Sequence, residues 1–377
     1  MSERPVRARE RAGPERPWER ASNASQPERP AAKQQEREAM SERRLGSVLA
    51  PGRVTVDVQL VPADLQAVLR RDARAGLGAM PKWMPPVWFY DDRGSALYEE
   101  ITRLPEYYPF RTEATLLQQA ADDISEAAKA RVLVELGSGT SEKTRLLLDA
   151  MASASAGLDG YVPFDVSEAT LRAAAGAIAA DLGIGVHAVV GDFHEHLDGI
   201  PDVGEPRLVA FLGSTIGNLA PAQRRRFLAD LRTVLDVSDR FLLATDLVKD
   251  AGRLVAAYDD ARGVTAEFNR NLLHVLNREL DADFVPERFE HVAAWDPDEQ
   301  WIEMRLRATD AMSVRLAAID MTVEFSAGEE MRTEISAKFT PPRVRSELSA
   351  AGFEVTGHWA DAEGDYLLTL ARPALTD

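Results

Sequence analysis

The chain has 377 residues, a formal net charge of −17 and 45% hydrophobic residues, which is typical of a globular protein with two domains or one large one. The acidic balance argues against nucleic acid as a partner, because neutralising phosphates requires a basic surface. The sequence has no cysteine and no stretch near the ~20 apolar residues of a membrane helix, which excludes disulfides and thiolate metal sites and predicts a cytoplasmic protein without a membrane partner.

Residues 1–45 differ from the rest of the chain. They are rich in Arg, Glu, Pro, Ser and Gln and almost free of large apolar side chains. Such a segment cannot bury enough surface to offset the entropy lost on ordering. We therefore predict a disordered N-terminal extension, with the structured pattern beginning near residue 57.

Helical patterns come first in the structured part. Residues 63–74 have the spacing of an amphipathic helix, and further helices are expected over 94–104 and 112–129. Proline residues break helical structure between the first two of these helices, at Pro81, Pro85 and Pro86.

From residue 131 to residue 245, short apolar runs alternate with helical patterns. This alternation predicts an α/β fold in which helices cover both faces of a parallel sheet. Ligands in such sheets bind beyond the carboxyl ends of the strands. The expected strands are 131–136, 161–164, 186–190, 207–212 and 240–245, and the helices between them are 143–151, 168–182 and 222–235.

After Asp246 the alternation stops. Residues 254–280 have the pattern of one long helix, whereas 301–307, 319–325 and 332–339 alternate as strands do. The last segments, 342–351, 353–359 and 365–370, are expected to form a helix and two strands that return to the sheet as an antiparallel edge. We predict one domain from residues 113–247 and 341–377, and a second α+β domain from residues 57–112 and 248–340.

A glycine turn, Gly137-Ser138-Gly139, follows the first of these strands. Glycines at this point let bare backbone approach a ligand. A phosphate loop and a dinucleotide-binding turn both require another glycine where this chain has Glu142, so both are disfavoured. S-adenosylmethionine (SAM) needs two glycines, and its sulfonium cation tolerates a carboxylate such as Glu135. The turn therefore favours SAM, with a turn that binds no ligand as the alternative.

Polar residues follow the next strands as well. A carboxylate at Asp165 can accept both hydroxyls of a ribose, or it caps the following helix. Asp192 beside Phe193 suits the amine and the face of an adenine, although a turn acid and a core ring would look the same. Asn218 offers a donor and an acceptor where a methyl acceptor would meet SAM, or it too caps a helix.

Two further groups lie beyond the sheet strands. Tyr258, Arg262 and Thr265 would share one face of the expected long helix, as a pocket wall or as a solvated face. Glu334 and Ser336 would lie on one side of a strand, about 7 Å apart, where they could hold a planar ring with two polar nitrogens. An exposed edge strand would show the same alternation. No metal site is expected, because the histidines near residue 195 have no third ligand.

Together these segments resemble the histidine-specific SAM methyltransferases over about residues 57–374. The resemblance rests on the motifs Glu135–Thr144, Phe211–Asn218, Thr245–Asp250, Tyr258–Asp260, Phe268–Asn271, Glu334–Phe339, Phe89–Ser95 and Leu104–Pro109. It implies a class I (Rossmann-like) SAM methyltransferase domain beside an α+β substrate-binding domain. It also implies transfer of three methyl groups to the α-amine of L-histidine, giving hercynine (trimethylhistidine) in ergothioneine biosynthesis.

The resemblance also implies roles for single residues. The SAM site would contain Gly137, Lys143, Asp165, Asp192 and Phe193. The amino acid end of histidine would contact Tyr107, Gly213, Asn218, Tyr258 and Thr265, and its imidazole would contact Glu334 and Ser336. Tyr90 and Tyr107 are the candidates for removing the amine proton, and we expect a monomer. The alternatives are a methyltransferase of another small amine or amino acid, a nicotinamide oxidoreductase and a non-catalytic SAM-binding regulator.

Overall fold

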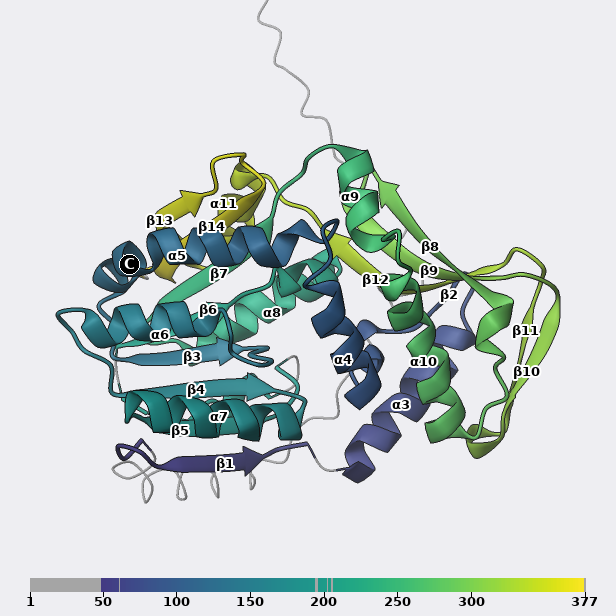
Figure 1. Ribbon diagram of the computed structural model, residues 1–377, viewed down its shortest axis with the longest axis horizontal. Helices are drawn as coiled ribbons and strands as arrows, with labels where there is room; N and C mark the ends of the chain where they lie inside the picture. Colours follow the sequence, from purple (N-terminus) through teal and green to yellow (C-terminus); the bar gives the residue numbers. More distant parts are fainter. Residues whose placement is uncertain (1–48, 61, 194–195, 202, 205, 376–377) are drawn as a thin grey trace, which may run out of the picture.

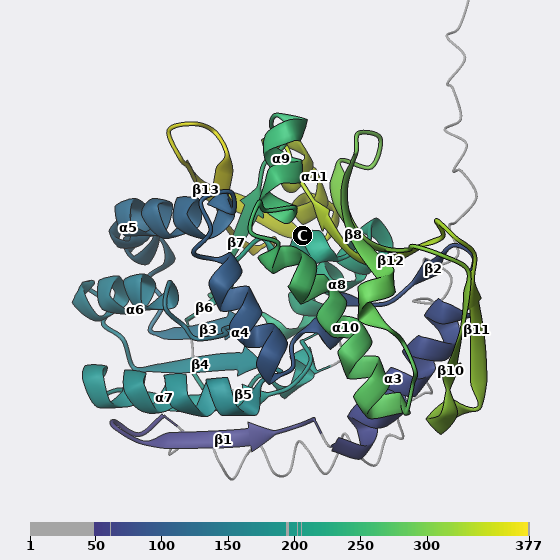
Figure 2. The same cartoon turned by 45° about the vertical axis from the view of Figure 1, so that its right-hand side comes forward.

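The computed structural model describes residues 49–60, 62–193, 196–201, 203–204 and 206–375 (Figure 1). The extension predicted over residues 1–45 lies outside the described residues. A large sheet occupies the left of Figure 1 and a smaller sheet the right, and helix α4 (Asp92–Ile101) lies between them in both views (Figures 1 and 2).

The large sheet has eight strands. They are β1 (Val54–Val58), β3 (Val132–Leu136), β4 (Gly160–Asp165), β5 (Gly185–Val190), β6 (Arg207–Phe211), β7 (Arg240–Asp246), β13 (Phe353–Ala360) and β14 (Tyr366–Pro373). Their order is β1-β5-β4-β3-β6-β7-β14-β13. The first six are parallel, while β14 and β13 complete the sheet in antiparallel pairing. The predicted α/β fold with an antiparallel edge is thus confirmed.

Helices cover both faces of this sheet, which explains why its central strands are continuous apolar runs. The helices are α5 (Tyr108–Ala128), α6 (Thr144–Ser153), α7 (Glu168–Leu182), α8 (Pro221–Val234) and α11 (Pro341–Ala350). Figure 1 shows α5, α6 and α7 in front of the sheet and α8 behind it. Every residue of β3, β5 and β6 is buried between the two layers.

The smaller sheet has its own apolar core. Its strands are β2 (Lys82–Trp83), β12 (Glu330–Ala337), β9 (Trp301–Ala308) and β8 (Phe289–Asp296), in the order β2-β12-β9-β8, and β10 (Met312–Leu316) pairs with β11 (Met321–Phe325) as a separate hairpin. The helices beside it are α3 (Pro62–Leu77), α9 (Ala251–Tyr258) and α10 (Val264–Leu280). Across both sheets, the described residues also form short 3₁₀ helices: η1 (Pro86–Phe89), η2 (Leu197–Gly199), η3 (Thr215–Asn218), η4 (Pro286–Arg288) and η5 (Ala317–Ile319). Leu69, Phe268 and Leu306 belong to this core.

The prediction of one long helix over residues 254–280 is wrong. The helix ends at Tyr258, and a new one begins at Val264 after Gly263, whose φ of 74° is in the left-handed region. The Asp260 carboxylate accepts hydrogen bonds from the backbone N–H groups of Val264 (3.0 Å) and Thr265 (2.7 Å) and so caps the second helix. Tyr258 and Thr265 therefore do not share the face of one helix.

Strands β1, β2, β8 and β10 were not predicted. Strand β1 is the most consequential, because it pairs in parallel with β5 and forms an edge of the large sheet. The expected start near residue 57 falls inside this strand. Among the described residues, no helix is both long and apolar enough to cross a membrane.

Candidate active site

The glycine turn joins the ends of three neighbouring strands. Gly137 and Gly139 have φ values of 72° and 50°, so both adopt the left-handed conformation that favours glycine. The N–H of Gly139 donates to Oδ2 of Asp165 (2.8 Å), which ends β4. A Cβ atom at Gly137 would lie 3.6 Å from the ring of Phe193, which follows β5. The structure thus brings Gly137, Asp165 and Phe193, which were predicted to bind SAM, to one edge of the sheet together with Gly139 of the glycine turn.

This edge fits the nucleoside part of SAM. A Cβ atom at Gly139 would meet nothing within 4 Å, so its backbone borders open space. Asp165 accepts one backbone N–H on each oxygen, from Gly139 and from Ser167 (3.0 Å), and each oxygen keeps a lone pair for a ribose hydroxyl. Asp165 lies two residues before Ser167, the N-cap of α7, so it is not the cap residue of that helix.

The buried carboxylate of Glu135 stabilises the strand and helix on either side of the glycine turn. Its carboxylate accepts hydrogen bonds from the hydroxyls of Tyr161 (2.5 Å) and Thr144, and burial raises the pKa of Glu135 to about 7. Because both of its oxygens have donors inside the protein, Glu135 holds strand β3 to the start of α6.

Lys143 takes part in a second set of buried contacts, with Glu113, which was not predicted from the sequence. It forms an ion pair with Glu113 of α5, whose side chain is 0% exposed. The other Glu113 oxygen accepts the N–H of Gly213 (2.7 Å), which follows β6. Burial alone would lower the pKa of Lys143, but the Glu113 carboxylate raises it above its ordinary value. Helical spacing held one clue, because Glu113 lies on the same face as the buried Leu116 and Leu117.

The helix η3 brings Asn218 against strand β12. A Cβ atom at Gly217 would lie 2.8 Å from the carbonyl oxygen of Ala337, so this close approach requires glycine. The Asn218 amide donates one N–H to Oε1 of Glu334 (3.0 Å) and the other to the carbonyl of Ile335 (2.9 Å). Both of its N–H hydrogens are used, and the Asn218 side chain does not cap a helix. Burial raises the pKa of Glu334 to about 7.

Tyr258, the last residue of α9, and Ser336 of β12 form a second pair. The two hydroxyl oxygens are 2.7 Å apart and buried. Residues expected at opposite ends of a bound histidine therefore meet in pairs, Asn218 with Glu334 and Tyr258 with Ser336.

Tyrosine rings extend this group of residues. The ring of Tyr107 lies edge-on to those of Tyr258 (centroids 6.0 Å apart) and Tyr98 (6.4 Å), and the ring of Tyr90 lies edge-on to that of Tyr98 (5.7 Å). Burial raises the pKa of Tyr107, and the pKa of Tyr90, which is 39% exposed, is raised as well, so both phenols are protonated at neutral pH. Tyr98 was not predicted from the sequence. Thr265 is the second residue of α10, and its backbone N–H donates to the Asp260 carboxylate.

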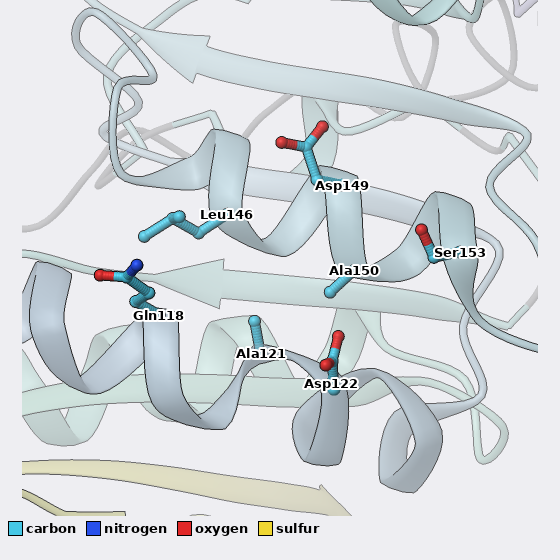
Figure 3. A pocket seen from close by; sticks show the side chains of 7 residues that line it. All are labelled: Gln118, Ala121, Asp122, Leu146, Asp149, Ala150 and Ser153. Atoms are coloured by element: carbon cyan, nitrogen blue, oxygen red, sulfur yellow. The ribbon is translucent and has the colours of Figure 1, made fainter.

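A surface hollow between α5 and α6 is a different place (Figure 3). It is lined by Gln118, Ala121, Asp122, Leu146, Asp149, Ala150 and Ser153, none of which is a predicted site residue. The convergence of hydrogen-bonded residues places the candidate site instead at the carboxyl ends of the parallel strands.

Comparison with known proteins shows the family of this chain. Residues 69–373 match the family of histidine-specific, SAM-dependent methyltransferases. Over 304 residues the chain is 60% identical to a histidine N-alpha-methyltransferase of Mycolicibacterium smegmatis and 55% identical to one of Mycobacterium tuberculosis, covering 80% of this chain and 94% of each relative. It is 26% identical to ergothioneine biosynthesis protein 1 of Neurospora crassa, over 78% of this chain and 34% of that protein. The chain therefore belongs to the histidine-specific, SAM-dependent methyltransferases.

Proposed function

We propose that this chain transfers methyl groups from SAM to the α-amine of L-histidine, three in succession, and so makes hercynine (trimethylhistidine) for ergothioneine biosynthesis. The observation that carries the proposal is the meeting of Asn218 with Glu334 and of Tyr258 with Ser336 at the edge where the glycine turn lies. The two relatives at 60% and 55% identity, both named histidine N-alpha-methyltransferase, support it. We also propose that the protein is a cytoplasmic monomer.

The cofactor half of the site comes from the strand ends. SAM, when bound, would supply an electrophilic methyl group: the lone pair of an amine forms a bond to its carbon as the bond to the sulfonium sulfur breaks, and a neutral thioether leaves. Asp165 would accept the ribose hydroxyls on the lone pairs that its two backbone donors leave free. Phe193 would offer a face to the adenine and Asp192 an acceptor for its amine. Gly137 and Lys143 would line the remainder.

The amine half depends on Asn218. Because both of its N–H groups are held by β12, its Oδ1 is left as an acceptor for an N–H of the substrate amine. In the first two transfers one N–H held in this way would orient the nitrogen and its lone pair; the neutral dimethylated amine has no N–H, so in the third transfer the surrounding side chains must orient it. Tyr107, Gly213, Tyr258 and Thr265 would surround the rest of the amino acid end. Positioning of this kind is the main source of acceleration for a displacement that needs no covalent intermediate.

The imidazole half is the pair Glu334 and Ser336. Carboxylate and hydroxyl on one side of a strand can bind the two ring nitrogens together. A site built around such polar atoms rejects rings that lack them, because its own groups are then left unpaired.

The amine must lose a proton before it attacks. Peptide α-amino groups have a pKa near ~8, so water can accept this proton at neutral pH. Tyr90 and Tyr107 are protonated, and we assign them to holding the substrate rather than to acting as tyrosinate bases. Their ring faces attract the ammonium that grows with each methylation.

The test uses the purified full chain with SAM carrying a labelled methyl group and a panel of amino acids, one at a time. We expect label in the histidine reaction and a trimethylated product by mass spectrometry. Transfer to another amino acid would reassign the substrate. Binding of SAM without transfer to any member of the panel would support a non-catalytic regulator.

A further inference from the structure

Lys338 is a fully buried lysine beside the candidate substrate site. It follows strand β12, and its side chain is 1% exposed. The next residue, Phe339, donates its N–H to the carbonyl of Asp246 at the end of β7 (2.8 Å). This pairing brings Lys338 to the carboxyl edge of the large sheet.

The ammonium of Lys338 has three acceptors. Its Nζ lies 2.9 Å from each of Asp246 Oδ2, Tyr258 Oη and Ser336 Oγ. An ammonium has three N–H donors and no acceptor, so these contacts use all of its donors. Burial alone would lower the pKa of Lys338, but Asp246 and Tyr258 raise it above its ordinary value, so Lys338 remains a cation.

The hydrogen bonds from Lys338 restrict the further hydrogen bonds that the hydroxyls of Tyr258 and Ser336 can make. A hydroxyl has one hydrogen and two acceptor positions. Lys338 fills one acceptor position on Tyr258 and one on Ser336. The bond between the two hydroxyls uses one of their hydrogens and fills the second acceptor position on whichever oxygen accepts it. That oxygen can make a further hydrogen bond only by donating, while the other oxygen keeps one acceptor position.

We propose that Lys338 is a positioning residue that makes the Tyr258–Ser336 pair present an O–H donor to the substrate ring. This inference rests on the proposed function. Glu334, two residues before Ser336 on the same strand, supplies an acceptor. The site then binds a ring that has one bare nitrogen and one N–H, which is the neutral form of imidazole. Lys338 acts through the hydroxyls and does not itself touch the ring.

The chain offers a matched control for this proposal. Lys249 forms an ion pair with the same Asp246 carboxylate and donates to Tyr108 (2.8 Å) and to the carbonyl of Asp365 (2.9 Å). No bond from Lys249 to Tyr258 or Ser336 is found among the described residues. Lys338→Met and Lys249→Met therefore each remove one cation that is paired with Asp246. Only Lys338→Met also removes the hydrogen bonds to the hydroxyls of Tyr258 and Ser336.

The experiment measures calorimetric affinities of the full chain for L-histidine and for thienylalanine, whose five-membered aromatic ring has no nitrogen. In Lys338→Met we expect histidine affinity to fall roughly tenfold, as for the loss of one oriented hydrogen bond, and thienylalanine affinity to stay within about twofold. Lys249→Met should keep the ratio of the two affinities close to that of the unaltered chain. SAM affinity, measured in parallel, reports that each variant is folded.

Two results would overturn the proposal: an unchanged ratio of the two affinities in Lys338→Met, whether neither falls or both fall equally, or the same shift of the ratio in Lys249→Met. If Lys338→Met does not fold, Lys338→Leu carries the same test, because Lys249 still neutralises the Asp246 carboxylate in that variant. Failure of the unaltered chain to bind or methylate histidine would instead refute the proposed function, which keeps the two failures distinct.

Discussion

Replacement of Glu334 is the sharpest test of the ring-binding assignment. In the structure Glu334 accepts one N–H from Asn218 at 3.0 Å, and its carboxylate keeps lone pairs for a ring N–H. A hydrogen bond to a charged acceptor is worth about 1.5–3 kcal/mol, so Glu334→Ala should weaken histidine binding by roughly 10- to 150-fold. Glu334→Gln keeps an oxygen acceptor but loses the charge, and should cost about tenfold.

The pH dependence of binding gives a second, independent measure of the same residue. Because burial raises the pKa of Glu334 to about 7, the group is neutral in mildly acidic solution and a carboxylate in mildly basic solution. Histidine affinity should therefore rise as the pH increases through this range. The imidazole of free histidine titrates nearby, at about 6.5, so Glu334→Gln supplies the baseline and the difference between the two proteins isolates the carboxylate.

Isothermal titration calorimetry with histidine and with SAM, from mildly acidic to mildly basic pH, is the appropriate assay. Glu330→Gln is the matched control, since Glu330 is a carboxylate on the same strand whose partners are Arg305 and Arg307. Equal losses of histidine and SAM affinity in Glu334→Ala would refute the assignment. Identical pH profiles for Glu334→Gln and the unaltered chain would refute the role of its charge.

Further predictions concern the cofactor edge, the tyrosines and the contact of η3 with β12. Asp165→Ala should weaken SAM binding about tenfold or more by calorimetry, and unchanged binding would show that this acid only holds backbone N–H groups. Tyr90→Phe and Tyr107→Phe should each lower kcat less than about tenfold, whereas a loss of ~100-fold or more with little change in KM would identify a general base. Gly217→Ala should lower the free energy of unfolding in urea by about 1–3 kcal/mol and weaken histidine binding, because the new methyl group meets the Ala337 carbonyl. Unaltered stability and affinity would show that the space beside the Ala337 carbonyl can accommodate the methyl group.

The parallel sheet could be predicted because its strands are buried on both faces. Every residue of β3 and β6 is buried, so each strand is a plain apolar run in the sequence. The edge strand β1 has exposed residues at both ends, and its pattern was too weak to identify. The prediction of one helix over 254–280 is wrong at Gly263. Glycine lowers the stability of a helix, so its presence already indicated a possible break at this residue.

The candidate site was predictable one residue at a time but not as a set of contacts. Asn218 and Glu334 stand 116 positions apart, and their hydrogen bond depends on the packing of η3 on β12. The buried partners were hidden for another reason. Glu113 and Asp246 are carboxylates at 0% exposure, although carboxylates are rarely buried, and only Glu113 had a clue in the sequence, its helical spacing from Leu116 and Leu117.

Glu113 has a consequence for how the two reactants affect each other's binding. One carboxylate holds Lys143, beside the cofactor turn, and the N–H of Gly213, in the loop that leads to Asn218. Two binding sites that both depend on the arrangement of one shared group are thermodynamically linked, and the linkage is reciprocal. Free energy spent on ordering this group by the first ligand is not required of the second. We therefore expect SAM and histidine to strengthen each other's binding by the same factor, whichever arrives first.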